Sequence, residues 1–365
     1  KASRTKALLN ISDKARYRYL LTGTPTLGSA TDMYAQMRIL SPHIFFNWDY
    51  YRFTKFFIVY SKPRLVYNKD GSKRLDSRRY PVGEKNIDVL NSLITPVSIR
   101  IRRNECEGLP DREEVFIKYT LSKEQKELYA SVVNNDRYTI NNKEYILTSP
   151  ALKYTKLTQI SSGFLYYQDE ENPKNRKIHV FSENPKLSML EEYIEDYLAN
   201  PDNKIIIWTN YDQEQEFISD KFSKYGLLEL RGKKDLDPFE VTQQFNNDPA
   251  IKILSAKQTM GISVDMSCAS TSFNFSRSPS LDSDIQSKNR IDGLAQKKEK
   301  ISFYYFTAPN LIDDHTHSII NSKINLDAAL TNVNMKCIGC KNLSNCLVKG
   351  IKYGTSNCQY SAALI

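Results

Sequence analysis

The C-terminal part of the chain carries four cysteines whose spacing suits metal binding. Cys337 and Cys340 form a Cys-x-x-Cys pair, Cys346 follows after five residues, and Cys358 follows after eleven more. A Cys-x-x-Cys turn brings two thiolates to one metal ion, and two later thiolates can complete a tetrahedral zinc site. The sequence therefore predicts Zn²⁺ in a Cys-rich tail, with an iron–sulfur cluster or unligated thiols as the alternatives.

Four other side chains able to bind metal stand in less suitable surroundings. Cys106 and Cys268 are isolated in the sequence, and we expect them to be inert buried residues. His315 and His317 follow two aspartates at the start of an expected helix. A solvated helix cap is the simpler interpretation of that stretch, so no metal site is predicted there.

The pentapeptide Leu21–Pro25 combines small polar residues in a way that suits phosphate chemistry. Thr22 and Thr24 flank Gly23, and the preceding Tyr17–Leu20 is expected to be a strand. Ligands of open α/β sheets bind at the carboxyl ends of the strands, where this arrangement offers two hydroxyls and an unhindered backbone. Such hydroxyls can hold a catalytic water or relay the state of a bound phosphate. An ordinary exit from strand to turn is the alternative.

A short run of arginines offers positive charge in an extended segment. Arg100, Arg102 and Arg103 stand among Ile99 and Ile101. Because side chains alternate along an extended chain, two of these arginines share one face. They could line a nucleic-acid track, or they could form a solvated edge that discourages strand pairing.

The composition limits the kinds of protein that this chain can be. Its 365 residues suit two domains and a tail, at roughly 100–200 residues per domain. With 40% hydrophobic and 25% charged residues, the sequence is typical of a globular protein and not of a disordered or fibrous one. No apolar run approaches the roughly 18 residues that span a bilayer, so no membrane partner is expected. The net charge of +9 favours an anionic partner such as a nucleic-acid backbone.

From residue 185 onward, short apolar runs alternate with amphipathic stretches, which is typical of a parallel sheet built from βαβ units. The expected strands are Lys204–Trp208, Leu227–Leu230, Ile251–Leu254, Thr271–Phe275 and Ile301–Phe306. The expected helices are Lys186–Leu198, Gln213–Lys224, Pro238–Phe245 and Asp282–Ile291. Asp237 should cap the helix that begins at Pro238. The predicted fold class is α/β, a parallel sheet with helices on both faces.

The region before this sheet is more varied. Ser41–Lys62 is rich in aromatic residues and is expected to be a helical elaboration, whereas Lys69–Lys85 is expected to be an exposed basic hairpin or loop. Val115–Tyr119 alternates like a strand. Leu121–Val133 is expected to be a helix, with Ser122 as its cap.

Several segments, in the same order, resemble the Swi/Snf family of superfamily-two helicases and translocases, over about residues 1–330. Lys1–Leu8 resembles the stretch after that family's Asp-Glu-x-His box, and Arg16–Pro25 resembles its third helicase motif, which implies a role for the hydroxyls in ATP coupling. Its passage into the second lobe is matched by Arg100–Arg103, Leu109-Pro110, Leu121–Gln125, Leu157–Phe164 and Lys186-Leu187. The resemblance implies two RecA-like lobes that clasp ATP and Mg²⁺.

Within the second lobe, Ile205–Asn210 resembles motif IV of this family. The resemblance implies that the polar exit of this strand, at Thr209 and Asn210, contacts the backbone of one DNA strand. A plain strand end is the alternative interpretation for either residue.

Ser255–Val264 resembles motif V, with Lys257 and Gln258 as candidate nucleic-acid contacts. The motif needs a tight turn that brings backbone N–H groups close to phosphates, and Gly261 permits such a turn. The family usually has more glycines here, so this copy is degenerate.

Gln286-x-x-x-Arg290 resembles motif VI, whose side chains reach the nucleotide from one face of a helix. An arginine finger stabilises charge on the transferred phosphoryl group through a planar, permanently charged fork, worth about 10³–10⁵ in rate in related NTPases. We assign this role to Arg290, with a solvated surface arginine as the alternative. The family usually carries a second arginine where this sequence has Gly293, which could lower hydrolysis unless a lysine such as Lys288 substitutes.

The sequence contains neither the Gly-x4-Gly-Lys-Ser/Thr loop nor the Asp-Glu-x-His box that hold ATP and Mg²⁺ in this family. We therefore expect the C-terminal part of a longer motor, cut just after the acidic box and inactive as an ATPase by itself. The expected domains are the end of a first lobe with a helical and basic insertion at 1–117, a complete second lobe at 118–330, and the tail at 331–365.

The leading hypothesis is an ATP-dependent translocase or helicase that moves on duplex DNA and remodels or unwinds it. The compact form resembles viral or phage members, which implies the cytoplasm of a bacterial or virus-infected cell, or the nucleus for a eukaryotic protein. The alternative is a non-catalytic nucleic-acid-binding or scaffold module derived from a degenerate helicase.

Overall fold

The computed structural model describes residues 3–21, 30–67, 73–77, 79, 81–99, 106–147, 149–169, 175–231, 237–260, 264–293 and 295–321. The chain divides into two compact units, Lys1–Glu105 and Cys106–Ile365. The predicted domain limits at residues 117 and 330 stay predictions. Within the described ranges, no helix has the length and apolar character needed to cross a bilayer.

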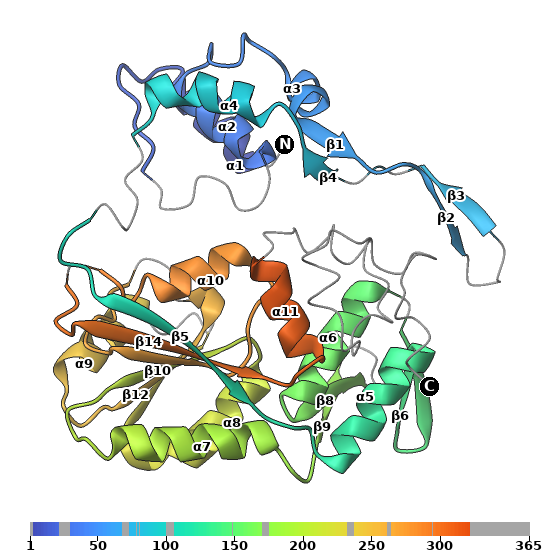
Figure 1. The fold of residues 1–365 in the computed structure, drawn as a ribbon, viewed down its shortest axis with the longest axis vertical. Coiled ribbons are helices and arrows are strands. Elements are labelled where there is room, and N and C mark those ends of the chain that lie inside the picture. Colours follow the sequence, from blue (N-terminus) through green and yellow to red (C-terminus); the bar gives the residue numbers. More distant parts are fainter. Residues whose placement is uncertain are drawn as a thin grey trace. The chain divides into compact units, whose positions relative to one another are not determined.

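The first unit consists of short helices and two-stranded antiparallel pairs (Figure 1). Its helices are α1 (Ser3–Ser12), α2 (Thr31–Leu40), α3 (Tyr50–Phe57) and α4 (Ile87–Ile94), the last followed by a 3-10 turn at Thr95–Val97. Its strand pairs are β1 (Ile58–Tyr60) with β4 (Pro81–Glu84), and β2 (Arg64–Tyr67) with β3 (Lys73–Asp76). A hairpin thus occurs in the predicted basic region, although β2 begins before Lys69.

An aromatic cluster forms the core of this unit. Asp49 caps α3 by accepting a hydrogen bond from the Arg52 N–H at 2.7 Å. The buried rings of Phe53 and Phe57 then lie 4.8 Å apart, and Phe45 lies 4.9 Å from Phe53. Of the helical elaboration predicted at Ser41–Lys62, the structure forms the helix α3, whereas Ile58–Tyr60 is the strand β1.

The strand predicted at Tyr17–Leu20 is not formed. These residues are irregular, and Tyr17, Tyr19 and Leu21 expose 69%, 83% and 97% of their surface. The described strands of this unit form two separate pairs, and neither pair includes Tyr17–Leu20. An apolar run without a pairing partner does not become a strand, because its backbone groups then stay bonded to water.

A six-stranded sheet with the order β11-β12-β10-β13-β14-β5 forms the centre of the second unit (Figure 1). Each neighbouring pair in it is parallel. Its strands are β5 (Asp111–Lys118), β10 (Ile205–Thr209), β11 (Leu227–Leu230), β12 (Ile253–Lys257), β13 (Thr271–Asn274) and β14 (Lys300–Thr307). The predicted α/β fold with a parallel sheet is confirmed.

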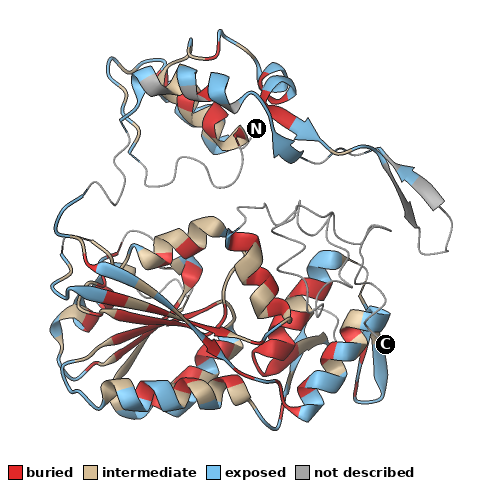
Figure 2. Ribbon diagram, in the orientation of Figure 1, coloured by how far each residue is buried: buried red, intermediate tan, exposed pale blue. Residues whose placement is uncertain are grey.

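Both faces of this sheet are covered by helices. Ile205 and Ile207 of β10 pack on one side with α7 (Pro185–Leu198) and α8 (Asp212–Phe222). Ile206 and Trp208 point to the opposite side and pack with α9 (Pro238–Asn247). These four side chains are at most 1% exposed, and Figure 2 shows the buried strands between the helices. Covering on both faces explains why β10 is apolar along its length.

The remaining helices of this unit largely match the sequence patterns. They are α5 (Lys123–Asn135), α6 (Pro150–Ser161), α10 (Leu281–Lys288) and α11 (Ile312–Asn321). Ser122 caps α5 in a reciprocal capping box with Gln125, and Asp237 caps α9 at 2.9 Å, as predicted. The helix predicted to reach Ile291 ends at Lys288, because the Arg290 and Ile291 N–H groups bond three residues back instead of four.

Two hairpins in this unit were not predicted. β6 (Arg137–Ile140) pairs with β7 (Lys143–Ile146), and β8 (Phe164–Gln168) pairs with β9 (Arg176–Val180). Asn141 and Asn142 make the first turn with φ values of 52° and 61°. Asparagine tolerates this left-handed region, which tight hairpin turns require, so the Asn-Asn pair was a usable signal.

Candidate nucleic-acid and nucleotide site

Three neighbouring strands of the six-stranded sheet end with polar residues at the same edge. β12, β10 and β13 are adjacent and parallel, with Thr209 opposite Lys257 and Trp208 opposite Asn274. The carboxyl ends of parallel strands meet at the same edge, which is where ligands of open α/β sheets bind. The structure therefore brings together the four predicted contacts Thr209, Asn210, Lys257 and Gln258.

Two of those four side chains are turned to protein partners. Thr209 is 0% exposed, and its hydroxyl donates to the Ala256 carbonyl at 3.3 Å. Gln258 is 1% exposed, donates to Asn274 Oδ1 at 3.1 Å and accepts from the Ser278 N–H at 2.9 Å. Both residues frame the edge of the sheet in this arrangement, because their polar atoms are occupied inside the protein.

Asn210 and Lys257 are only half-buried. The Asn210 side-chain amide donates to Ser276 Oγ at 2.9 Å. Lys257 Nζ lies 2.6 Å from Asp212 Oδ1, and the two side chains are 21% and 67% exposed. A surface ion pair of this kind is weak, so an anion such as a phosphate can compete for the ammonium group.

Glu214 and Ser276 also belong to this edge, although the sequence did not single them out. Glu214 is fully buried near the start of α8, and its Oε2 accepts from Ser276 Oγ at 2.7 Å and from the Asn210 N–H at 2.8 Å. Burial raises the pKa of the Glu214 carboxyl, although hydrogen bonds from these neighbours oppose the shift. A glutamate three residues after a helix cap was the available signal, but it does not distinguish an exposed cap from a buried one.

The proposed finger lies just beyond α10, not on its face, which corrects the predicted helical placement. Arg290 Nε donates to the Gln286 carbonyl at 3.0 Å, and Nη1 donates to the Val264 carbonyl at 3.1 Å. The Gln286 side chain instead donates to Asp282 Oδ1 at 2.7 Å. Partial burial lowers the pKa of Arg290, and the charge of Asp265 opposes this. Arg290 thus joins the segments that resemble motifs V and VI.

A network of buried charges anchors α10. Arg277 holds Asp284 with two hydrogen bonds of 2.7 and 2.9 Å, and both side chains are less than 10% exposed. Lys288 lies 3.0 Å from Asp284 and 2.6 Å from Glu114 of β5. Although burial alone would raise it, contact with Arg277 leaves the pKa of Asp284 below its usual value. The network fixes the helix that leads to Arg290.

Several predicted site residues lie outside the described residues. They are Thr22, Gly23, Thr24, Arg100, Arg102, Arg103, Gly261, Cys337, Cys340, Cys346 and Cys358. Their proposed roles in ATP coupling, nucleic-acid contact and zinc binding stay predictions.

Four side chains were not expected to bind metal, and three of them differ from the predicted burial. Cys106 is exposed, not buried. Cys268 is half-buried, and burial raises its pKa to about 11. His315 is not a solvated cap, since it is 4% exposed and burial lowers its pKa to about 4. The apolar side of α11, which the two preceding aspartates obscured, turns His315 inward.

The part of the chain that the structure describes has no group of three or more His, Cys, Asp or Glu placed to hold a metal ion.

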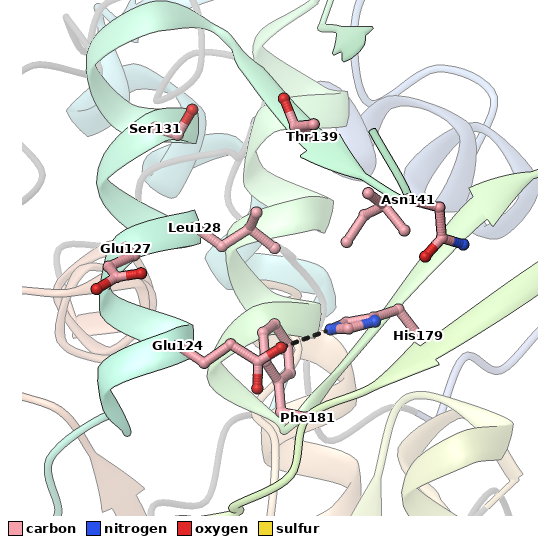
Figure 3. Close-up of a pocket in the computed structure, with 9 residues that line it drawn as sticks. Glu124, Glu127, Leu128, Ser131, Thr139, Asn141, His179 and Phe181 are labelled. Carbon is pink, nitrogen blue, oxygen red and sulfur yellow. Dashed lines mark hydrogen bonds and ion pairs between the residues drawn. The ribbon is translucent and has the colours of Figure 1, made fainter. Parts of the chain in front are cut away.

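A separate pocket of about 350 Å³ lies between α5, the β6–β7 turn and β9 (Figure 3). Leu128, Ile140 and Phe181 give it apolar walls, and His179 Nε2 lies 3.0 Å from Glu124 Oε1 at its side. None of the residues that line it was predicted to be functional. The pocket is thus distinct from the strand exits.

The second unit is a parallel α/β lobe with polar strand exits at one edge. In comparison with known proteins, the model of the SNF2-related domain matches residues 1–163 of the chain. The chain is 21% identical over 321 residues to the ISWI chromatin-remodeling complex ATPase CHR11 of Arabidopsis thaliana, covering 86% of this chain and 28% of that protein. It is 19% identical over 388 residues to the ATP-dependent helicase fft3 of Schizosaccharomyces pombe, covering 88% and 41%.

Solved structures give weaker matches. The C-terminal part of the Fun30 ATPase domain matches with a TM-score of 0.49 and 15% identity, over 67% of this chain and 97% of that one. The Sulfolobus solfataricus SWI2/SNF2 ATPase core in complex with dsDNA matches with a TM-score of 0.41 and 18% identity, over 96% and 69%.

The match of residues 1–163 to the SNF2-related domain agrees with the resemblance drawn from the motifs. The chain spans about 28% of the length of the ISWI-type ATPase CHR11. These relatives come from a plant and a fission yeast, and the viral or phage origin stays a prediction.

Proposed function

We propose that this chain forms part of an ATP-dependent translocase that moves on duplex DNA and remodels or unwinds it. The observation that carries the proposal is the placing of Asn210 and Lys257 at one edge of the parallel sheet in a chain whose residues 1–163 match the SNF2-related domain. The net charge of +9 is consistent with a polyanionic track. Relatives of the chain carry the names of ATPases and ATP-dependent helicases.

Each of the two residues has a role that its chemistry supports. Lys257 offers an ammonium whose present partner, Asp212, is exposed and can give way to a phosphate. Asn210 offers an amide, which can bond to phosphate or sugar oxygens. Contacts of this kind position a protein on DNA without reading its sequence, as movement along a track requires.

Arg290 is our choice for the nucleotide side. Its guanidinium carries the right charge and is held in place by the Val264 and Gln286 carbonyls. A guanidinium has five N–H donors, so Arg290 can keep these two bonds and still offer other donors to a transferred phosphoryl group. Closure of the motor around ATP would bring that group within reach.

A non-catalytic nucleic-acid-binding module is the second candidate. Two observations favour it, namely the occupied donors of Arg290 and the Gly293 that replaces the family's second arginine. In that case Arg290 would only tie two segments of the lobe together.

The ATPase rate of the complete gene product, measured with and without duplex DNA, separates the two candidates. The translocase predicts a stimulation of at least about tenfold, together with ATP-dependent displacement of a third strand from a triplex. A protein that binds the same duplex without stimulated hydrolysis or displacement would be the scaffold module.

A further inference from the structure

Glu214 joins two strand exits and one helix start through a single oxygen atom. Its Oε2 accepts hydrogen bonds from the Asn210 N–H at 2.8 Å, the Tyr211 N–H at 3.2 Å and Ser276 Oγ at 2.7 Å. Asn210 follows β10, Tyr211 precedes α8, and Ser276 follows β13. The carboxylate therefore holds together the ends of β10 and β13 and the start of α8.

Burying this carboxyl is costly. Glu214 is 0% exposed, and the hydrogen bonds from the Asn210 N–H, the Tyr211 N–H and Ser276 Oγ all go to its Oε2. Burial disfavours the ionised form of a carboxyl. Capping a helix does not require this arrangement, since the neutral amide of Gln125 does the same for α5. The location of the carboxyl thus needs another reason.

Asn210 supplies that reason, because hydrogen bonds hold both its backbone and its side chain. Its backbone N–H bonds to Glu214, and its side-chain amide bonds to Ser276 Oγ, which itself donates to Glu214. Glu214 and Ser276 are buried, whereas Asn210 is only half-buried. The direction of the Asn210 side chain therefore depends on a carboxylate that cannot itself touch a ligand at the surface.

We propose that Glu214 is a positioning residue for the DNA contact of Asn210, acting through Ser276. This inference rests on the proposed function, since it deepens the role of the same edge. The carboxylate is needed as a strong acceptor of three donors, and a neutral acceptor of the same shape keeps most of that function.

The test measures the duplex concentration that gives half-maximal ATPase stimulation of the complete gene product, alongside the DNA-free rate. Asn210→Ala and Glu214→Ala should each raise that concentration about fivefold, the effect of losing one hydrogen bond. Glu214→Gln should restore it to within about twofold, because the amide keeps an acceptor oxygen. The double alanine variant should be no worse than Asn210→Ala alone, because both act on one contact.

Gln125→Ala is the matched control, since it removes a buried capping side chain from α5. It should lower the melting temperature and leave DNA half-saturation unchanged. If Glu214→Ala behaves in the same way while Asn210→Ala weakens DNA, the positioning role is wrong and the proposed function stands. If Asn210→Ala has no effect, the DNA contact is wrong and this inference falls with it.

Ser276→Ala covers the case in which Glu214→Ala does not fold. It removes only the hydroxyl that links Glu214 to Asn210. A rise of about threefold or more in half-saturating DNA supports the inference, and an unchanged value overturns it.

Discussion

The polar groups at the strand exits of the six-stranded sheet differ in their partners from the guanidinium of Arg290. We call the place where Arg290 contacts Val264 and Gln286 the Arg290 corner. At the exits, Thr209 and Gln258 are buried against protein partners, which leaves Asn210 and Lys257 half-buried at the edge. At the corner, the guanidinium itself is bonded to two backbone carbonyls. The residues proposed for DNA are thus held in position by side chains, whereas the residue proposed for the nucleotide is tied to the backbone through two of its five donors.

This difference has a consequence for the order of events. A preorganised edge can engage DNA without rearrangement, because its framework is already satisfied. The arginine can act only when a nucleotide comes within reach of its remaining donors, so its contribution should depend on closure around ATP. DNA binding should therefore occur in the resting state, and engagement of the finger in the ATP-bound state.

Removing the finger should have the largest effect. Arg290→Ala is expected to lower DNA-stimulated kcat by at least about 10²-fold, since a finger is worth about 10³–10⁵ in related NTPases and one arginine is missing here. Half-saturating DNA should stay within about twofold. A kcat close to that of the parent protein, with a lowered melting temperature, would make Arg290 a structural residue and erase the contrast.

The loss of stability of the protein in acid tests whether His315 is buried as in the structure. His315 has a folded-state pKa of about 4, against an ordinary value near 6.5, because burial disfavours its charged form while Asp314 opposes the shift. The unfolded chain binds the extra proton between these values, so stability is fully present above pH 6.5 and is lost as the pH falls toward 4.

We expect the unfolding free energy of the parent chain to fall by up to about 3 kcal/mol more than that of His315→Phe between pH 7.5 and 4. Urea titrations at several pH values measure this difference. Parallel pH profiles for the two proteins would mean that His315 is exposed in solution.

Restoring an arginine at Gly293 should have a smaller effect of opposite sign. A Cβ built at Gly293 meets no atom within 4 Å, so a side chain fits there. Gly293→Arg is expected to raise DNA-stimulated kcat about tenfold, and Gly293→Ala should leave it unchanged. If the arginine variant is folded and no faster, the corner does not face the nucleotide.

Much of the second unit could be predicted from its sequence. β10 is a run of apolar residues covered on both faces, and Asp237-Pro238 marked the start of α9, so period and capping rules applied directly. The Tyr17–Leu20 strand could not be judged in this way. Whether an apolar run becomes a strand depends on a neighbouring strand edge, which local sequence does not contain.

The candidate site was predictable in location but not in detail. The motifs predicted Thr209 and Lys257 as nucleic-acid contacts, and the register shows that they lie opposite each other on neighbouring strands. The burial of Thr209 and the three-way contact of Glu214 depend on side chains far apart in the sequence, such as Ser276. Hydrogen bonds of this kind follow from tertiary packing, so no local pattern reports them.

The most direct test of the DNA-binding edge compares two lysines. Lys257 and Lys224 each pair with an acidic side chain, at 2.6 and 3.2 Å, but only Lys257 lies at the carboxyl edge. Lys257→Ala should raise the half-saturating duplex concentration about fivefold and reduce the salt dependence of binding by about one phosphate contact. Lys224→Ala should change neither. Equal effects of the two substitutions, or none from Lys257→Ala, would contradict the assignment of this edge to DNA.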